Sequence, residues 1–511
     1  MTQVSVSSVA REPRVRLVRD NAPAGHETAS VTSLAAVSAR ANKRPLVVDL
    51  DGTLVRSDLL IETAFSELGA RPQSIVDMLR ALLRGKAALK HRLAEPVDFD
   101  PAMLPYDDGV LAYIEDARAA GRPVYLASAS NRRLVEAIAD HLGIFTGWIG
   151  SDEGMNLAGV NKAELLVEEF GERGFDYIGN SAADLPVWAR ASKVIAIRAP
   201  GGVARQLAKT GFDVEHLACP RPTWRTWAKL IRVHQYAKNA LVFVPLLAAH
   251  QFELQAAGQA LLAFLAFSLC ASSVYVLNDL VDLRDDRLHR TKCNRPLACG
   301  AIPLHLGVLA IPLLFAASLL VAAAVSLPFL GVLLGYFALT TAYSFFLKRK
   351  MLIDVVTLAG LYTTRVIGGA VAVQVFVSPW LLAFCMALFM SLALVKRFVE
   401  LAARRDANMP DAGTRDYRTA DLGMVGALAA GSGFNAVTVF ALYISSNAVS
   451  QYYTNPQILW LVCPILMYWI GRVLMLAQRR VMDDDPVVFA LKDRVSLVTI
   501  GVAGALVVAA I

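Results

Sequence analysis

The sequence predicts two fold classes in one chain, a soluble α/β domain followed by an all-α polytopic membrane domain of about nine transmembrane helices. Of the 511 residues, 56% are hydrophobic and 18% are charged, and the mean hydropathy is +0.47. Soluble domains have about 25% charged residues. The hydrophobic excess lies after residue 237, in spans close to the ~20 residues that cross a bilayer as a helix. Between 45 and 215, short apolar runs alternate with helix-like segments, which is typical of an α/β domain with a parallel sheet.

The domains are expected in a simple order along the chain. Residues 1–44 are rich in Ser, Thr and Arg and lack an apolar signal-peptide stretch, so a disordered tail is expected there. The α/β domain is expected at 45–215, with a small helical cap over 55–105. A linker with an interfacial helix follows at 216–236, and the membrane domain at 237–511. Strands are predicted at 46–50, 124–127, 177–179 and 194–197.

Nine apolar spans make up the predicted membrane domain. Connections near 252–256, 327, 374–378 and 447–456 contain no Lys or Arg, whereas the alternate connections hold nearly all of them. The positive-inside rule therefore places the N-terminal domain in the cytoplasm of a bacterial inner membrane and the C-terminus outside. The first span is the shortest. The spans lie at about 239–251, 257–277, 304–326, 328–347, 352–373, 379–395, 423–446, 457–477 and 494–511.

Charge and cysteine content exclude other classes. A net charge of +7 is too small an excess for a nucleic-acid-binding chain of this length, so no nucleic-acid partner is expected. The six cysteines form no CxxC pair and have no His at metal-ligand spacing. We therefore expect reduced, structural cysteines instead of a disulfide framework or a zinc site.

The first motif, Asp49-Leu50-Asp51-Gly52-Thr53-Leu54, directly follows an apolar strand. Two carboxylates at the carboxyl end of a strand can point into one site, and the Gly-Thr turn lets the backbone approach a phosphate. Over about 45–215 the chain resembles the haloacid dehalogenase superfamily of phosphatases. The resemblance implies a Rossmann-like fold, Asp49 as nucleophile and Asp51 as general acid and base.

Further phosphatase residues are implied by the same resemblance. Ser128, with Ser130 as second choice, matches the phosphate-binding hydroxyl, and Lys162 matches the lysine that neutralises the phosphoryl group. Asn180 and Asp184 match the acidic magnesium motif, in which the first position is usually Asp. The implied Mg²⁺ ligands are Asp49, Asp51, Asn180 and Asp184. Because Asn180 removes one negative charge, this site should hold the ion more weakly.

The second motif follows the second span and reads Asn278-Asp279-Leu280-Val281-Asp282-Leu283-Arg284-Asp285-Asp286. If helical, positions 278, 282 and 286 form one stripe. Stacked carboxylates repel one another unless a divalent cation lies between them, so this stripe indicates Mg²⁺ bound to a diphosphate.

Over about 224–511 the chain resembles the UbiA superfamily of intramembrane prenyltransferases, through Asn278, Asp279, Asp282 and Asp286. The second aspartate motif of prenyl-transferring members is missing, because Lys396, Arg397 and Glu400 stand in its place. In detail the chain looks most similar to the branch that transfers a 5-phosphoribosyl group from phosphoribosyl diphosphate to a polyprenyl phosphate. Asp279 and Asp282 would act in catalysis, and Asp279, Asp282 and Asp286 would bind one or more Mg²⁺.

Such a reaction needs cations for the anionic substrates and no general base. Arg365 is set apart by its depth, about 14 residues into the fifth span, because a charge there must face a polar cavity or a partner. The anion it would meet stays open. The substrate-binding candidates are Lys238, Asn278, Lys292, Arg295, Lys348, Arg365, Lys396, Arg397 and Glu400.

Three functions remain open at this level. The favoured one is a lipid-phosphate phosphoribosyltransferase fused to a phosphatase, which would remove the 5-phosphate of the product. The second is a prenyltransferase acting on an aromatic or other small acceptor. The third is a transporter or lipid scaffold with a regulatory domain, which a carboxylate stripe at a membrane surface disfavours. Lipid chain length and oligomeric state have no signal in the sequence.

Overall fold

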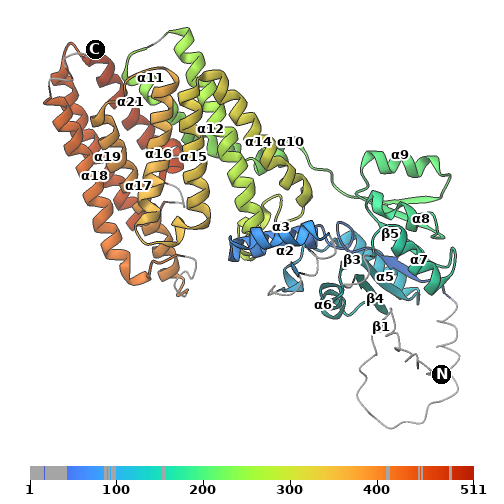
Figure 1. Ribbon diagram of the computed structural model, residues 1–511. Helices are drawn as coiled ribbons and strands as arrows, with labels where there is room; N and C mark the ends of the chain where they lie inside the picture. The colour runs from blue at the N-terminus through green and yellow to red at the C-terminus, as the bar shows by residue number, and fades with distance from the viewer. Residues whose placement is uncertain are drawn as a thin grey trace, which may run out of the picture. The chain divides into compact units, whose positions relative to one another are not determined.

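The structure is a computed structural model (Figure 1). It describes Arg16, Leu17, 43–85, Leu89, Arg92, Leu93, 99–151, 157–251, 253–409, 415–446, Val449, 453–482 and 486–511. The chain divides into two compact units. The N-terminal unit comprises Met1–Leu230 and Asp279–Val308, and the membrane unit comprises Ile231–Asn278 and Leu309–Ile511.

A seven-stranded sheet forms the centre of the N-terminal unit, in the order β1-β4-β3-β2-β5-β6-β7. All neighbouring strands are parallel except β1, which pairs antiparallel with β4. The predicted parallel α/β fold is therefore confirmed, and all four predicted strands are present. The strands are β1 (Arg16–Leu17), β2 (Leu46–Val48), β3 (Val124–Asn131), β4 (Gly147–Ser151), β5 (Asp176–Gly179), β6 (Val194–Ile197) and β7 (Val214–Leu217).

Hydrophobic cores cover both faces of the sheet, which explains its nearly continuous apolar strands. Leu46 and Val48 belong to one core, whereas Val47 belongs to the other, because successive side chains of a strand point to opposite faces. The helices of this layer are α5 (Asp108–Ala119), α6 (Arg132–Leu142), α7 (Val160–Phe170), α8 (Leu185–Trp188) and α9 (Gly201–Lys209), with the 3₁₀ turns η1 (Pro101–Met103) and η2 (Ala182–Asp184).

The cap predicted over 55–105 contains two helices, α2 (Leu59–Ala70) and α3 (Ser74–Leu83). Asp58 caps α2 by accepting a hydrogen bond from the backbone N–H of Ile61. The remaining cap positions lie partly outside the described residues. The tail predicted at 1–44 lies outside them except for Lys43, Arg44 and the two residues of β1, which form a strand where no order was expected.

Among the described residues, seven helices are long and apolar enough to cross a membrane. They match seven of the nine predicted spans and lie at Leu254–Val281, Leu304–Val325, Leu327–Phe345, Ile353–Ala372, Pro379–Asp406, Thr419–Ile444 and Pro456–Gln478. The regular helices within them are α12 (Leu254–Val281), α14 (Leu304–Val325), α15 (Leu327–Phe345), α16 (Ile353–Ala372), α17 (Pro379–Asp406), α18 (Leu422–Ile444) and α19 (Val462–Gln478). The short elements are α10 (Trp224–Leu230), α13 (Leu283–Leu288), η4 (Lys292–Asn294), η5 (Leu347–Arg349), η6 (Thr419–Asp421), η8 (Pro456–Leu461) and α20 (Pro486–Lys492).

The two other predicted spans take different forms. The last one is α21 (Arg494–Ala510), a shorter apolar helix. The first one is not a regular α-helix, because the chain forms the eleven-residue 3₁₀ helix η3 (Val233–Phe243) and the five-residue helix α11 (Val244–Ala248). At a rise of about 2.0 Å per 3₁₀ residue and 1.5 Å per α residue, these two elements extend about 30 Å, close to the thickness of a bilayer core.

Candidate active sites

The Asp49–Thr53 loop follows β2, the strand at the middle of the sheet. β2 pairs with β5 so that Val48 lies opposite Ile178, and the backbone N–H of Asp49 donates to the carbonyl of Ile178 at 3.0 Å. Gly52 has a φ of +73°, and a Cβ there would lie 2.1 Å from the Asn180 amide. Only glycine suits this turn. The loop therefore lies beside Asn180, as the sequence predicted.

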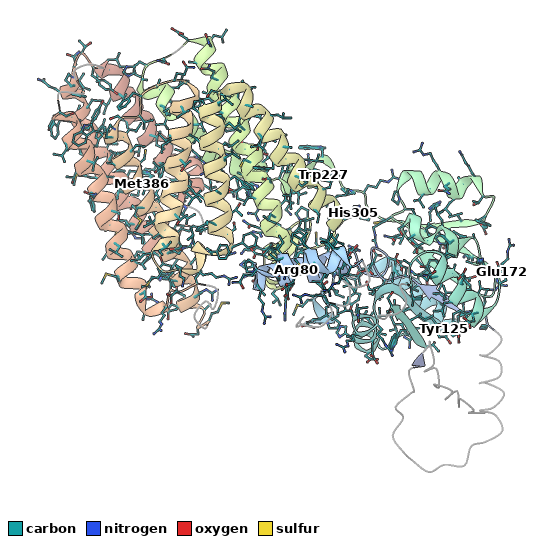
Figure 2. All side chains as sticks on the ribbon, in the orientation of Figure 1. Arg80, Tyr125, Glu172, Trp227, His305 and Met386 are labelled. Carbon is teal, nitrogen blue, oxygen red and sulfur yellow. The ribbon has the colours of Figure 1, made fainter. Side chains whose placement is uncertain are left out.

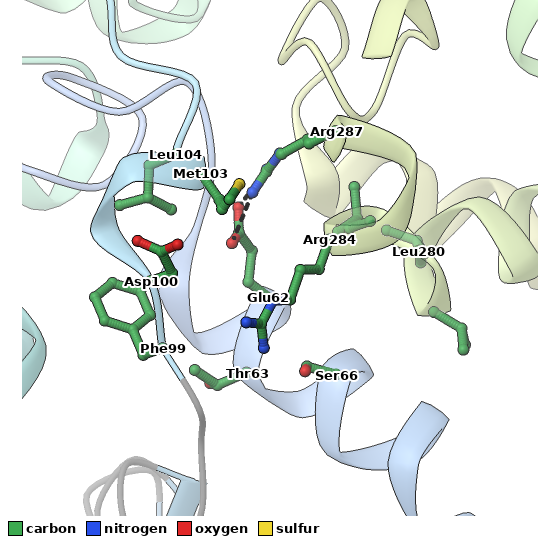
Figure 3. Close-up of a pocket in the computed structure, with 12 residues that line it drawn as sticks. Glu62, Thr63, Ser66, Phe99, Asp100, Met103, Leu104, Leu280, Arg284 and Arg287 are labelled. Carbon is green, nitrogen blue, oxygen red and sulfur yellow. Dashed lines mark hydrogen bonds and ion pairs between the residues drawn. The ribbon is translucent and has the colours of Figure 1, made fainter. Parts of the chain in front are cut away.

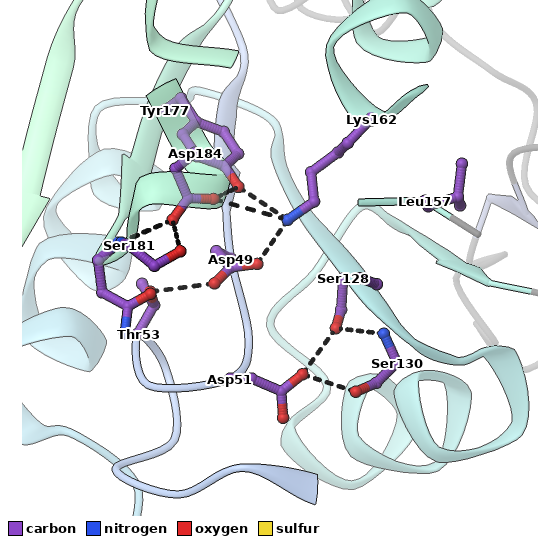
Figure 4. A network of polar contacts seen from close by, with 12 residues as sticks. Asp49, Asp51, Thr53, Ser128, Ser130, Leu157, Lys162, Tyr177, Ser181 and Asp184 are labelled. Atoms are coloured by element: carbon purple, nitrogen blue, oxygen red, sulfur yellow. Dashed lines mark hydrogen bonds and ion pairs between the residues drawn. The ribbon is translucent and has the colours of Figure 1, made fainter. Parts of the chain in front are cut away.

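Asp49 and Lys162 form a buried ion pair at the centre of this site (Figure 4). Lys162 Nζ donates to Asp49 Oδ1 at 2.6 Å, and Thr53 Oγ1 donates to Asp49 Oδ2 at 3.2 Å. Burial raises the pKa of Asp49 to about 7, although Lys162 pulls it down. Burial also disfavours the charge on Lys162, but Asp49 and Asp184 outweigh it and hold the pKa of Lys162 above its ordinary value.

Asp51 is held by the two serines that sequence analysis singled out. Asp51 Oδ2 accepts hydrogen bonds from Ser128 Oγ at 3.1 Å and Ser130 Oγ at 2.6 Å. Its other oxygen accepts from the backbone N–H of Leu59, the first residue of α2, at 2.8 Å. Both serines thus come together with the DxD loop, and the cap begins with a direct bond to Asp51.

Asp184 lies in a polar network that includes a residue the sequence analysis missed, Tyr177. The Tyr177 hydroxyl donates to Asp184 Oδ1 at 2.8 Å and accepts from Lys162 Nζ at 2.9 Å. Asp184 Oδ2 accepts from the N–H groups of Asn180 and Ser181 at 3.0 and 2.9 Å. Asp184 and Asp49 help burial to raise the pKa of Tyr177 well above its ordinary value, so Tyr177 is a neutral bridge between Lys162 and Asp184.

The donor set of this site suits Mg²⁺ only in part. The Asp49 carboxylate and the Asn180 amide oxygen are hard ligands on neighbouring strand ends. Asp184, which was expected to be a metal ligand, already accepts from Tyr177, Asn180 and Ser181. Its position indicates that it orients Lys162 and the Asn180 loop.

An arginine that the sequence analysis did not consider fixes the DxDGT loop from outside. Arg198 donates to the carbonyl oxygens of Gly52 and Thr53 and forms an ion pair with Asp107. Asp107 also accepts from Arg56 Nε at 2.9 Å. These bonds hold the DxDGT loop through contacts within the protein.

The polar residues at the end of α12 and directly beyond it do not form the single helical stripe that the sequence predicted. α12 ends at Val281, and α13 begins at Leu283, so the helix breaks at Asp282. Asp279 and Asp286 nevertheless lie close together, because Arg295 Nη1 bonds to Asp279 at 3.0 Å and to Asp286 at 2.5 Å. We call these three residues the Arg295 cluster. The break at Asp282 brings Asp286 back toward Asp279 and Arg295.

Burial raises the pKa of Asp286 to about 6, while Arg295 lowers it. Within the described ranges, no three His, Cys, Asp or Glu side chains gather closely enough to hold a metal ion. Asp279 and Asp286 still fit Mg²⁺ chemically, because they are adjacent hard oxygen ligands with one arginine between them. Asn278 and Asp282 flank them half-buried, and Lys292 is exposed on η4.

A pocket in the N-terminal unit lies next to this loop (Figure 3). Half of its twelve lining residues are apolar, and the charged ones are Glu62, Asp100, Arg284 and Arg287. Arg287 donates to both carboxylate oxygens of Glu62, at 2.5 and 3.1 Å, and to the carbonyl of Ala298. The two hydrogen bonds between Arg287 and Glu62 connect α13 to the cap helix α2.

Arg397, predicted to bind a substrate phosphate, is instead buried against acidic side chains of the membrane unit. Its Nε donates to Asp354 Oδ2 at 2.6 Å, and its Nη1 forms an ion pair with Glu400. Tyr417 donates to Asp354 Oδ1 at 2.6 Å, Tyr343 lies 3.3 Å from Arg397 Nη2, and Arg415 forms a second ion pair with Glu400. We call these six residues the Arg397 cluster. Since its donors face protein groups, Arg397 is placed to fix this end of the membrane unit.

Arg365 is 4% exposed and meets neutral polar groups. It donates to Asn239 Oδ1 at 2.7 Å, to the Leu361 carbonyl at 2.6 Å and to the Tyr336 hydroxyl at 2.8 Å. One turn further along α16, a Cβ on Gly369 would lie 2.0 Å from the Val242 carbonyl. Arg365 and Gly369 together hold η3 against α16, which explains how a 3₁₀ helix of this length persists.

The remaining candidates lie in the membrane unit. Lys238 is buried on η3, next to Asn239. Lys348 lies on η5 and Lys396 on α17, and both are half-buried. All six cysteines are free thiols in the structure.

Comparisons with known proteins match both predicted domains. Residues 240–497 match the UbiA prenyltransferase family, and residues 46–188 match the haloacid dehalogenase-like hydrolases. The uncharacterized protein y4nM of Sinorhizobium fredii is 37% identical over 458 residues, which cover 89% of this chain and 88% of that protein. The decaprenyl-phosphate phosphoribosyltransferase of Mycobacterium tuberculosis is 36% identical over 180 residues, which cover 34% of this chain and 59% of that protein.

Among solved structures, a UbiA homolog from Archaeoglobus fulgidus bound to GPP and Mg²⁺ is 16% identical. It aligns with a TM-score of 0.43 over 55% of this chain and 99% of that chain. Both matched families are enzymes that generally depend on Mg²⁺. With its seven apolar helices, this chain is a multi-pass membrane protein. It belongs to the UbiA prenyltransferase family and carries a haloacid dehalogenase-like domain at its N-terminus.

Proposed function

We propose that the protein transfers a 5-phosphoribosyl group from phosphoribosyl diphosphate to a polyprenyl phosphate. The observation that carries this proposal is the 36% identity of its UbiA part to a decaprenyl-phosphate phosphoribosyltransferase. The pairing of charges in the Arg397 cluster also supports phosphoribosyl transfer over prenyl transfer. Carboxylates that stand near the expected second aspartate motif are already paired with Arg397 and Arg415.

The residues suit the chemistry of this transfer. A phosphate oxygen of the lipid attacks the anomeric carbon, and the bond to the diphosphate breaks, so that no general base is required. Mg²⁺, held by Asp279, Asp282 and Asp286, would neutralise the departing diphosphate. Arg295 would exchange its carboxylate bonds for bonds to a substrate phosphate. Lys238, Lys292, Lys348 and Lys396 are the further candidates for anion contacts.

We propose that the haloacid dehalogenase-like domain removes the 5-phosphate from the product. The Asp49 carboxylate would attack phosphorus, and Asp51 would protonate the departing 5-hydroxyl oxygen. Asp51 would then take a proton from the water that hydrolyses the aspartyl-phosphate. Lys162 is 2.6 Å from Asp49, and Ser128 and Ser130 lie beside Asp51, where charged oxygens of the phosphoryl group would lie.

Both domains would act on the cytoplasmic side of the membrane, because phosphoribosyl diphosphate is a soluble cytoplasmic compound. The proposal therefore keeps the predicted orientation in a bacterial inner membrane, with the N-terminal domain in the cytoplasm and the C-terminus outside. The second candidate function, prenyl transfer to a small acceptor, is favoured by the matched family's description. Against prenyl transfer, this chain lacks the second aspartate motif of prenyl-transferring members.

A reconstituted assay distinguishes these functions. Purified protein in lipid nanodiscs receives labelled phosphoribosyl diphosphate with polyprenyl phosphate, or labelled prenyl diphosphate with an aromatic acceptor. We expect labelled lipid only in the first reaction. Asp49→Asn should leave transfer intact and make the phosphorylated lipid accumulate. Equal ratios of phosphorylated to dephosphorylated lipid in wild type and Asp49→Asn would contradict the phosphatase role.

A further inference from the structure

The cap helix α3 has an unusual distribution of side chains. It buries Ser74 and Ala81, whereas five large apolar side chains are between 47% and 89% exposed with every described residue in place. These five are Ile75, Val76, Leu79, Leu82 and Leu83. At 100° per residue they project within an arc of about 120°. One whole face of α3 is therefore apolar and uncovered by the described residues.

The apolar side chains of α3 are as exposed as those on helices of membrane-spanning length. Leu79 is 56% exposed and Leu83 is 89% exposed, compared with 74% for Leu320 on the membrane-spanning helix α14. Covering a side chain of this size contributes about 1.5 to 3 kcal/mol. Contiguous exposed apolar surface on a soluble unit indicates an interaction site.

Charge identifies the partner. Arg80 is exposed on α3 and, at 100° per residue, lies beside the apolar face (Figure 2). Arg84 directly after the last residue of α3 and Arg71 three residues before its first residue are exposed as well. Asp77 is the acidic residue of α3 and pairs with Arg80 at 3.3 Å. A basic rim beside an apolar face is typical of helices that lie in the headgroup layer of anionic membranes.

A bilayer is also within covalent reach. Only residues 218–223 separate β7 from α10, a connection of roughly 20 Å when fully extended. The same chain continues into seven helices of membrane-spanning length and composition. The covalent connection therefore keeps the α/β fold within reach of a membrane without the help of another protein.

We propose that α3 is an in-plane membrane anchor, with its five apolar side chains among the acyl chains and Arg80 and Arg84 at anionic headgroups. α2 and α3 are joined by three residues, and the first N–H of α2 bonds to Asp51. Anchoring α3 therefore orients the phosphatase loop toward the bilayer surface. This inference goes beyond the proposed function and does not depend on it.

Photo-crosslinking tests the anchor in the full-length protein. p-Benzoylphenylalanine replaces Leu83, with Leu320 as a lipid-facing control and the exposed Glu115 of α5 as a water-facing control. The protein is placed in nanodiscs of phosphatidylcholine with or without phosphatidylglycerol. We expect lipid adducts at positions 83 and 320 and none at 115, with the yield at 83 rising with phosphatidylglycerol. Crosslinks from position 83 to a second chain or another protein segment, or no adduct at all, would overturn the proposal.

Paired charge variants add a second readout. Leu79→Glu with Ile75→Glu should lower the lipid-adduct yield at position 83 about tenfold, because carboxylates resist the acyl region. Ala112→Glu with Ala119→Glu adds the same charges to the exposed face of α5 and should leave the yield unchanged. Unchanged melting of both variants verifies folding. An equal yield in the two pairs would contradict the anchor, and this outcome is separate from any result on phosphoribosyl transfer.

Discussion

The Arg295 and Arg397 clusters both place an arginine between two carboxylates, but they differ in exposure and charge. The Arg295 side chain is 25% exposed, whereas that of Arg397 is 2% exposed. In the first cluster one guanidinium serves Asp279 and Asp286. In the second, Arg397 and Arg415 serve Asp354 and Glu400.

This difference separates exchangeable from permanent ion pairing. Two carboxylates with one partly exposed arginine keep a net negative charge, so they attract a divalent cation. A charge-balanced cluster offers a cation no net attraction, and breaking its buried Arg397–Asp354 pair leaves a charge unpaired in a low-dielectric environment. The same side chains thus suit ligand binding in one region and structural rigidity in the other.

The largest expected effect is on the buried cluster. Arg397→Met should destabilise the folded protein by about 3 to 5 kcal/mol, because Asp354 is fully buried and loses its charged partner. Thermal unfolding in nanodiscs measures the change. Arg415→Met is the matched control and should cost about 1 kcal/mol or less, since Arg415 and Glu400 are 27% and 30% exposed. Equal losses in the two variants would remove the distinction between the clusters.

The next largest effect is expected on lipid transfer, from a substitution at Asp282. Asp282→Ala is expected to reduce lipid transfer by about a hundredfold to a thousandfold, because a proposed ligand of the diphosphate-bound ion is lost. The exposed neighbour Asp285 provides the control, and Asp285→Ala should retain activity. Initial rates with saturating lipid measure both. Full transfer by a well-folded Asp282→Ala protein would rule out the assignment.

A smaller and opposite pair of effects is expected for Arg295→Gln. Without the competing guanidinium, Mn²⁺ used in place of Mg²⁺ should bind up to about tenfold more tightly. The KM of phosphoribosyl diphosphate should rise, because a phosphate contact is lost. Electron paramagnetic resonance and steady-state kinetics provide the two measurements. Weaker Mn²⁺ binding would show that Arg295 supports the ion site instead of competing with it.

The smallest effect is expected for Tyr417→Phe, which removes the hydroxyl that donates to Asp354 at 2.6 Å. The ion pair with Arg397 remains, so a loss of about 1 kcal/mol is expected from thermal unfolding. Tyr343→Phe should cost still less, because its bond to Arg397 is longer at 3.3 Å. The reverse order would contradict the view that Asp354 carries the cluster.

The structure brings the predicted phosphatase residues together because the order of the parallel strands places them near one another. Asp49 and Asn180 directly follow the parallel strands β2 and β5, and Ser128 lies in the second half of the neighbouring strand β3, so all three are near one edge of the sheet. Tyr177 could not be found in this way. Its ring belongs to a buried apolar strand, and only its hydroxyl reaches Lys162 and Asp184.

The membrane region was predicted less completely for physical reasons that differ by residue. Asp354 had a signal, since an acid within a predicted span needs a partner, but only the fold identifies Arg397 as that partner. The break at Asp282 had none, because no Gly or Pro marks it. Likewise, the 3₁₀ form of η3 depends on tertiary contacts with Arg365 and Gly369.

Mn²⁺ binding in the presence of inorganic diphosphate tests the central distinction most directly. The measurement compares wild type with Asp279→Asn/Asp286→Asn and with Glu400→Gln, each as full-length protein in nanodiscs. The account predicts that the aspartate variant loses a bound Mn²⁺ ion and that Glu400→Gln loses none. Loss of an ion in Glu400→Gln, or no loss in the aspartate variant, would contradict it.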